Sequence, residues 1–227
     1  MKAYQAVDIR NIAVVGHGDS GKTILCEAML LCGGKINRIG SIENGTTISD
    51  YHPGEKTRQI SIHATPMFLE WKEKKINVID APGYMDFIGE ALSSLSIADM
   101  ALVVVHAVNG IEVGTEQMWA HATKQGIPKI LVVNGLDREH TKFDEILASA
   151  RSRFGNNVFP MQLPISAGPG FTQVLDVLSK NVFTHQNDSS GKYTEKPAEG
   201  DLVETVEKLH EELIEFVAES DDTLLEK

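Results

Sequence analysis

Residues 14–23 read VVGHGDSGKT, and the last eight of them follow the pattern G-x-x-x-x-G-K-T. It comes directly after an aliphatic run and opens a helical pattern. Glycines allow backbone N–H groups to close around a phosphate, a lysine supplies positive charge to the β/γ oxygens, and a threonine hydroxyl can bind Mg²⁺. A simple strand-to-helix turn would explain the glycines but not the Lys-Thr pair. The predicted phosphate site consists of Gly16, His17, Gly18, Asp19, Ser20, Gly21, Lys22 and Thr23.

Hydrophobic periodicity predicts an α/β fold around this loop. Aliphatic, strand-like runs cover residues 11–15, 74–80, 100–105 and 129–134. Helical patterns at residues 22–31, 85–98, 114–126 and 142–155 lie after or between them. Such alternation is typical of a mostly parallel sheet with helices on both faces, joined by right-handed crossovers. We therefore expect the P-loop NTPase architecture.

One interval interrupts the alternation. Residues 33–55 show no apolar periodicity and are rich in Gly, Ser, Thr, Asn and Asp, after which residues 59–71 alternate as an edge strand would. Long loops inside compact α/β units usually carry function. A functional loop is the favoured interpretation, and a disordered insertion is the alternative.

Composition limits the partners. The formal net charge is −11, so the surface as a whole would repel a phosphate backbone or anionic lipid, and we expect neither direct DNA binding nor a membrane. The chain shows no signal peptide and no run long enough to span a bilayer. Its two cysteines, Cys26 and Cys32, fit neither a metal site nor a disulfide framework. A cytoplasmic protein is expected.

Two further motifs suggest which nucleotide binds. INVIDAPG places Asp80 at the end of a predicted strand, where it could hold Mg²⁺ through water, and Gly83 could offer its N–H to a γ-phosphate. LVVNGLD places Asn134 and Asp137 after another strand, at the ligand-binding edge of the sheet. A carboxylate pairs with the N1–H and amino group of guanine but not with adenine. We therefore predict a guanine site at residues 134–137.

The ordered motifs GHGDSGKT, KTRQISI, DAPGYMDF and NGLDRE resemble the GTP-binding domain of the translational GTPases, and within them elongation factor G. The resemblance extends over essentially the whole chain. It implies binding of GTP/GDP with Mg²⁺, hydrolysis of GTP to GDP and phosphate, and the ribosome as partner. The pairing of Tyr84 with Gly18 resembles that of a divergent branch of elongation factor G-like proteins, whose members carry Tyr at this place.

The resemblance also implies an organisation. Residues 1–156 would form the GTP-binding domain, with switch I at about 33–62 and switch II at about 80–95. Residues 157–227 would begin the elongation factor G-type inserted subdomain and end in an acidic helix. The chain would be an N-terminal fragment whose fifth guanine motif lies beyond residue 227. Alternatively, Ser166 and Ala167 in PISAGPGF are that motif.

The implied roles of individual residues follow the family motifs. Lys22 would serve catalysis as well as phosphate binding. Thr23 and Ser61 would bind Mg²⁺ directly, and Asp80 would do so through water. Ser61 replaces a threonine of the family pattern and retains the hydroxyl.

Three departures from the family bear on activity. Tyr84 stands where the family has the histidine that orients the attacking water, and a phenol with a pKa near 10 is a poor substitute for an imidazole. Gly18 replaces an aliphatic residue of the hydrophobic gate over that water. Gly135 replaces the lysine whose stem covers the guanine ring, although it remains within the predicted nucleotide site. The alternative function is therefore a GTP/GDP-binding module with negligible hydrolysis.

Overall fold

The computed structural model describes residues 3–155, 158–186 and 190–218, and it divides into two compact units, Met1–Gly135 and Leu136–Lys227. We describe each unit by itself. The domain boundary that we predicted between residues 156 and 157 stays a prediction. The two compact units divide between residues 135 and 136, so the helix at residues 143–154 falls in the second unit.

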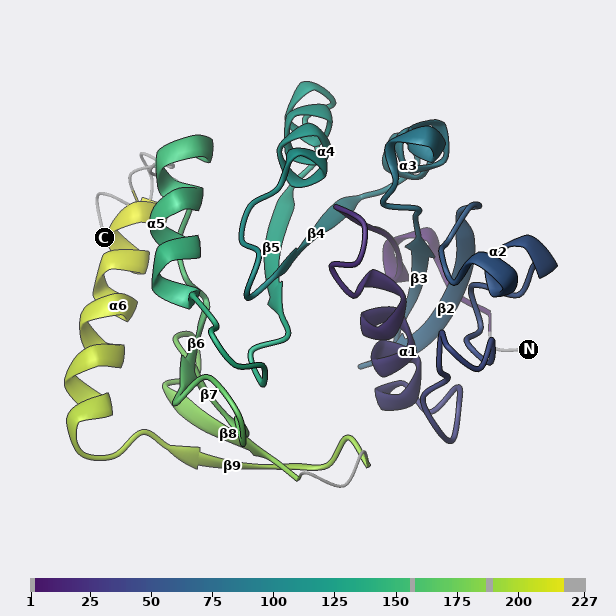
Figure 1. The fold of residues 1–227 in the computed structure, drawn as a ribbon. Helices are drawn as coiled ribbons and strands as arrows, with labels where there is room; N and C mark the ends of the chain where they lie inside the picture. Colours follow the sequence, from purple (N-terminus) through teal and green to yellow (C-terminus); the bar gives the residue numbers. More distant parts are fainter. Residues whose placement is uncertain (1–2, 156–157, 187–189, 219–227) are drawn as a thin grey trace. The chain divides into compact units, whose positions relative to one another are not determined.

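The first unit is built on a five-stranded sheet in the order β2-β3-β1-β4-β5 (Figure 1). All neighbouring pairs are parallel except β2 with β3, which is antiparallel. The strand order places β2 at the edge of the sheet, as the alternating pattern predicted, but the strand covers only residues 65–71 of the predicted 59–71. The strands are β1 Ile9–Gly16, β2 Thr65–Trp71, β3 Lys74–Asp80, β4 Met100–His106 and β5 Lys129–Asn134.

Helices cover both faces of this sheet, as predicted. On one face Val14 packs with Cys26 and Leu30 of α1. On the other face Ala13 and Val15 pack with residues of α3 and α4, which lie next to each other in Figure 1. Successive strand residues point to opposite faces, so the continuous aliphatic run of β1 serves two cores. The helices and short 3₁₀ turns are η1 Ala6–Asp8, α1 Lys22–Cys32, α2 Pro53–Arg58, η2 Met85–Phe87, α3 Ile88–Ser96 and α4 Val113–Lys124.

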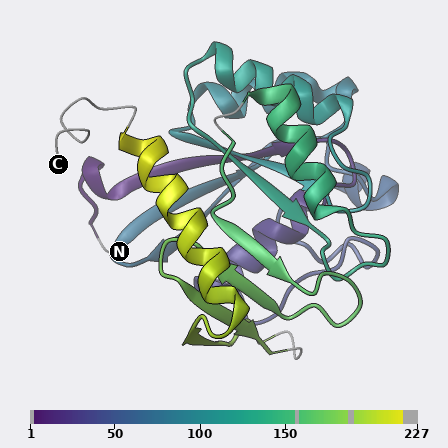
Figure 2. The same ribbon diagram turned by 90° about the vertical axis from the view of Figure 1, so that its left-hand side faces the viewer.

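The second unit has an antiparallel sheet in the order β6-β7-β8-β9 and two helices. Helix α6, yellow in Figure 2, packs on β7, and the buried Val206 and Leu175 lie on these two elements. The elements are α5 Phe143–Phe154, β6 Gln162–Ile165, β7 Gln173–Asp176, β8 Asn181–His185, β9 Tyr193–Pro197 and α6 Asp201–Ala218. The predicted acidic helix is therefore α6, and residues 219–227 lie outside the described residues. Within the described part of the chain, no helix combines the length and apolar character needed to cross a bilayer.

The long loop that follows α1 is ordered by two buried glutamates. Glu27 of α1 accepts backbone N–H bonds from Gly40 at 2.8 Å and Ile48 at 2.6 Å. Glu55 of α2 accepts bonds from the N–H groups of His52, Ile62 and His63 at 3.0–3.1 Å. Both glutamates are at least 98% buried. The loop is therefore clamped to α1 and to the start of β2, which excludes the disordered alternative.

We predict that Glu27→Gln loosens this loop. The two carboxylate oxygens of Glu27 each accept one backbone N–H, whereas a glutamine has one accepting oxygen and would turn its NH₂ group toward the other N–H. One buried unsatisfied group costs about 1–3 kcal/mol. Tryptic cleavage at Arg38, Lys56 or Arg58 should therefore accelerate by roughly five- to a hundredfold if it requires local opening.

The matched control is Glu43→Gln in the same loop, because Glu43 is exposed and accepts its bond from the Ser41 hydroxyl. This variant should be cleaved at the wild-type rate. Equal cleavage of Glu27→Gln and wild type, measured by mass spectrometry over time, would show that Glu27 does not hold the loop.

Candidate functional site

The loop between β1 and α1 has the backbone that a phosphate-binding loop requires. Gly16 has φ +142°, and a Cβ at this position would lie 2.4 Å from the carbonyl oxygen of Val104. Gly21 has φ +89°, and a Cβ there would lie 2.1 Å from Nδ2 of Asn134. Any side chain at either position would be both strained and obstructed. The two glycines thus allow the loop to lie against Val104 of β4 and Asn134 of β5.

Lys22 and Thr23 lie in the first turn of α1 and are buried. The Lys22 ammonium donates to the carbonyl oxygen of His17 at 2.6 Å, across the mouth of the loop. Burial lowers the pKa of Lys22, and the negative charges of Asp80 and Asp19 oppose this effect. The structure therefore places a cation at the position that the sequence predicted.

Oxygen-bearing side chains from three segments meet beside Lys22. The Thr23 and Ser61 hydroxyl oxygens are 3.3 Å apart, and the Ser49 hydroxyl donates to Oδ2 of Asp80 at 2.7 Å. The nearby Ser61 hydroxyl opposes the rise that burial causes in the pKa of the Asp50 carboxyl. The predicted set Thr23, Ser61 and Asp80 is thus brought together by α1, the long loop and β3.

Several oxygens in this cluster are left without partners. Among the described residues, four buried side-chain oxygens near the phosphate loop and the long loop accept or donate no hydrogen bond: Ser20 Oγ, Thr47 Oγ1, Asp50 Oδ2 and Asp80 Oδ1. Burial raises the pKa of the Asp80 carboxyl to about 6 and also raises that of Asp50. Unpartnered buried oxygens are costly in a folded protein unless a ligand satisfies them. A ligand bound beside these oxygens would supply the partners that the protein does not give them.

Sequence reasoning missed the contribution of Ser49 and Asp50. Both lie in the run TTISD, residues 46–50, inside the loop that we assigned to function as a whole. The concentration of oxygen-bearing side chains in that run was the available signal. Only the folding of the loop onto Asp80 distinguishes these residues from the other polar ones.

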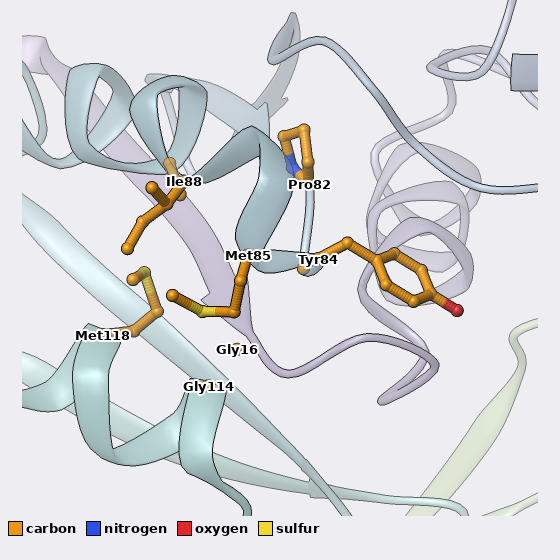
Figure 3. Close-up of a pocket in the computed structure, with 9 residues that line it drawn as sticks. Gly16, Pro82, Tyr84, Met85, Ile88, Gly114 and Met118 are labelled. Carbon is orange, nitrogen blue, oxygen red and sulfur yellow. The ribbon is translucent and has the colours of Figure 1, made fainter. Parts of the chain in front are cut away.

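The segment after β3 approaches the phosphate loop closely. A Cβ on Gly83 would lie 2.3 Å from the Lys22 ammonium and 2.7 Å from the His17 carbonyl oxygen, so only glycine fits. The next residue, Tyr84, donates its hydroxyl to Oδ2 of Asp19 at 3.0 Å. Figure 3 shows its ring directed away from Met85, Ile88 and Met118, which line a small pocket on the other side of this segment.

His17 joins the phosphate loop to α4. Its Nδ1 accepts the backbone N–H of Gly114 at 3.3 Å, and its Nε2 lies 3.6 Å from a carboxylate oxygen of Glu112. A Cβ on Gly114 would be 2.8 Å from that Nδ1. These contacts support a role for His17 in shaping the loop.

The predicted guanine motif straddles the two units. Asn134 ends β5 and donates to the Ser20 carbonyl oxygen at 3.1 Å, which ties it to the phosphate loop. Gly135 follows with φ +82°. Asp137 belongs to the second unit, in which the N–H of Gly168 donates to the carbonyl oxygen of Leu136 at 2.7 Å. Ser166 and Ala167 directly precede Gly168, whose N–H contacts the residue before Asp137. The location of the fifth motif stays a prediction.

Comparison with known proteins agrees with this geometry. Residues 7–222 match the family model of the elongation factor Tu GTP binding domain. Elongation factor G of Mycoplasma genitalium is 34% identical over 96% of this chain and 32% of its own length. The mitochondrial ribosome-releasing factor 2 of Debaryomyces hansenii is 36% identical over 96% of this chain and 27% of its own length.

A solved structure agrees as well. A crystal structure of a Thermus thermophilus protein superposes with a TM-score of 0.90 at 36% identity, and the match covers 98% of this chain and 33% of that protein. The chain thus spans about a third of the length of the relatives it matches. With a P-loop α/β fold and a family match over almost its whole length, the chain belongs to the elongation factor Tu-type GTP-binding domains and is homologous to the corresponding part of elongation factor G.

Proposed function

We propose that this chain is the guanine-nucleotide switch of an elongation factor G-like translation factor that hydrolyses GTP on the ribosome. The observation that carries the proposal is the convergence of Thr23, Ser61 and Asp80 beside the buried Lys22 ammonium, at the carboxyl edge of the sheet. Ligands bind at this edge in open α/β folds. The homology to elongation factor G supports the ribosome as partner.

The oxygen cluster fits Mg²⁺. Hydroxyl and carboxylate oxygens are the ligands that this ion takes, and Asp80 Oδ1 and Asp50 Oδ2 have no other partner among the residues described. Thr23 and Ser61 would hold the ion directly, whereas Asp80 and Asp50 would hold its water ligands. Bound Mg²⁺ would neutralise charge on the β/γ oxygens.

The protein groups would bind the rest of the nucleotide as follows. The backbone N–H groups of residues 16–23 and the Lys22 ammonium would bind the phosphates, and the N–H of Gly83 would reach the γ-phosphate. Asn134 and Asp137 would select guanine. Gly135 supplies no side chain to cover the base, so we expect weaker binding with unchanged base choice.

The step that distinguishes an active GTPase from a binding module is the positioning of the attacking water. Tyr84 offers no imidazole, and its hydroxyl is engaged with Asp19. Gly18 offers no apolar side chain for a gate. These observations favour slow hydrolysis, and they are the reason to keep the nucleotide-binding regulatory module as the second candidate function.

Base selection is tested by calorimetric titration of this chain with GDP and with ADP, each with Mg²⁺. GDP should bind and ADP should not, because only guanine offers two donors to the Asp137 carboxylate. Asp137→Ala should weaken GDP binding by roughly ten- to a hundredfold, as expected when hydrogen bonds to a charged group are lost. Asp144→Ala, in the first turn of α5, is the matched acidic control and should bind GDP normally. Equal affinity for GDP and ADP would refute the base assignment.

Hydrolysis is tested by single-turnover GTP cleavage in the full-length protein, with and without ribosomes. The ribosome should accelerate cleavage, and Tyr84→His should increase the ribosome-dependent rate by at least about tenfold, because a positioned imidazole typically contributes about 10²–10⁴-fold. No acceleration by ribosomes, together with tight GTP binding, would favour the regulatory module. An unchanged rate in Tyr84→His would exclude water positioning as the limiting defect.

A further inference from the structure

The two departures at the hydrolytic end of the site occupy the same space. A Cβ added to Gly18 would lie 3.2 Å from Cζ of Tyr84 and 3.3 Å from both of its Cε atoms. These distances are shorter than ordinary van der Waals contact, and a branched side chain would extend further into the ring. A side chain at position 18 would therefore require the tyrosine ring to shift, by a few tenths of an ångström for a Cβ alone and by more for a branched side chain. Glycine at position 18 lets the ring of Tyr84 lie directly against the backbone of the phosphate loop.

Asp19 holds the other end of the tyrosine. Its carboxylate accepts the phenol hydrogen bond at 3.0 Å, between residues 65 positions apart in the chain. Asp19 has φ +59°, a left-handed conformation that aspartate and asparagine tolerate better than most residues. The hydrogen bond to Asp19, with some burial and the charge of Asp19, raises the pKa of the Tyr84 phenol. The phenol thus keeps its proton and directs it at Asp19.

Gly83 and Tyr84, which follow β3, both lie against the phosphate loop. Gly83 precedes Tyr84 and already lies against Lys22 and the His17 carbonyl. The ring of Tyr84 lies over Gly18, and its hydroxyl reaches Asp19. Residues 83 and 84 therefore both contact the phosphate loop. Tyr84 is among the residues that line the small pocket with Met85, Ile88 and Met118, but its ring points away from these three side chains (Figure 3).

We propose that Gly18, Asp19 and Tyr84 form one positioning unit that fastens the segment after β3 onto the phosphate loop. Asp19 positions the Tyr84 ring through the hydrogen bond to its hydroxyl. Gly18, which has no side chain, leaves room for the ring. Because this segment covers the phosphate loop, the unit slows the release of bound nucleotide. The contact itself is independent of the proposed function, and only the effect on nucleotide release rests on it.

The contact is tested on the nucleotide-free chain by following tyrosine ionisation in the ultraviolet as pH is raised. The signal of Tyr84 is the difference between matched proteins with and without Tyr84→Phe. Asp19→Asn, which suits the left-handed backbone, should move the Tyr84 midpoint to lower pH, because it removes the charge that opposes ionisation. Gly18→Val should do the same by displacing the ring. The signal of Tyr193, obtained with Tyr193→Phe, is the control and should not respond to either change.

A second measurement avoids high pH. The ¹³Cζ resonance of Tyr84 at neutral pH should move toward that of a solvated phenol in Asp19→Asn and in Gly18→Val. If neither the midpoint nor the resonance of Tyr84 responds to Asp19→Asn, the contact does not exist in solution and the proposal is wrong.

The effect on nucleotide is tested by the release of a fluorescent GDP derivative from the chain. Tyr84→Phe and Asp19→Asn should each speed release by roughly two- to tenfold, the range for loss of one hydrogen bond, and the double variant should be no faster than the faster single one. Multiplying effects, or no effect of either change, would overturn the fastening role. Failure of wild type to bind GDP at all would refute the proposed function instead, and the tyrosine measurements would still decide the contact.

Discussion

The buried ammonium group of Lys22 is the charge around which the first unit arranges its functional edge. A buried cation is tolerated only where hydrogen bonds and opposite charges compensate for lost hydration. The His17 carbonyl oxygen supplies the hydrogen bond at 2.6 Å, and Asp80, Asp19 and Asp50 supply the negative potential. The phosphate loop, the end of β3 and the long loop are therefore all drawn to one point.

The two buried carboxyl groups beside Lys22 are not fully satisfied by the protein. Asp80 and Asp50 are pushed toward their neutral forms by burial, and each retains an oxygen without a partner among the described residues. A cation and a phosphate bound here would together satisfy groups to which the protein gives no partner. The buried glutamates Glu27 and Glu55 hold the long loop beside these groups. Glu27 anchors Gly40 and Ile48, and Glu55 anchors residues 62 and 63.

The Gly18 and Tyr84 departures have different meanings in sequence and in structure. Taken separately, each removes part of the apparatus that orients water in the family. In the structure, the ring of Tyr84 lies so close to Gly18 that a Cβ at position 18 would be 3.2 Å from its Cζ, so the two departures fit each other sterically. The contact that results joins the same two segments that the nucleotide would join.

The α/β class, the strands, the phosphate loop and the order of the motifs could be predicted from the sequence, because they depend on short-range periodicity and on residue types within a few positions. The family motifs implied Mg²⁺-binding roles for Thr23, Ser61 and Asp80, and these roles stay predictions. The clamping of the loop by Glu27, the place of Ser49 and Asp50 beside Asp80, and the contact of Tyr84 with Asp19 are seen only in the folded chain. These contacts link segments 13 to 65 residues apart in the chain, beyond the range of local patterns. These residues meet because the crossover connections bring the carboxyl ends of β1 and β3 to the same edge of the sheet. Local sequence patterns do not show which distant residues this arrangement brings together.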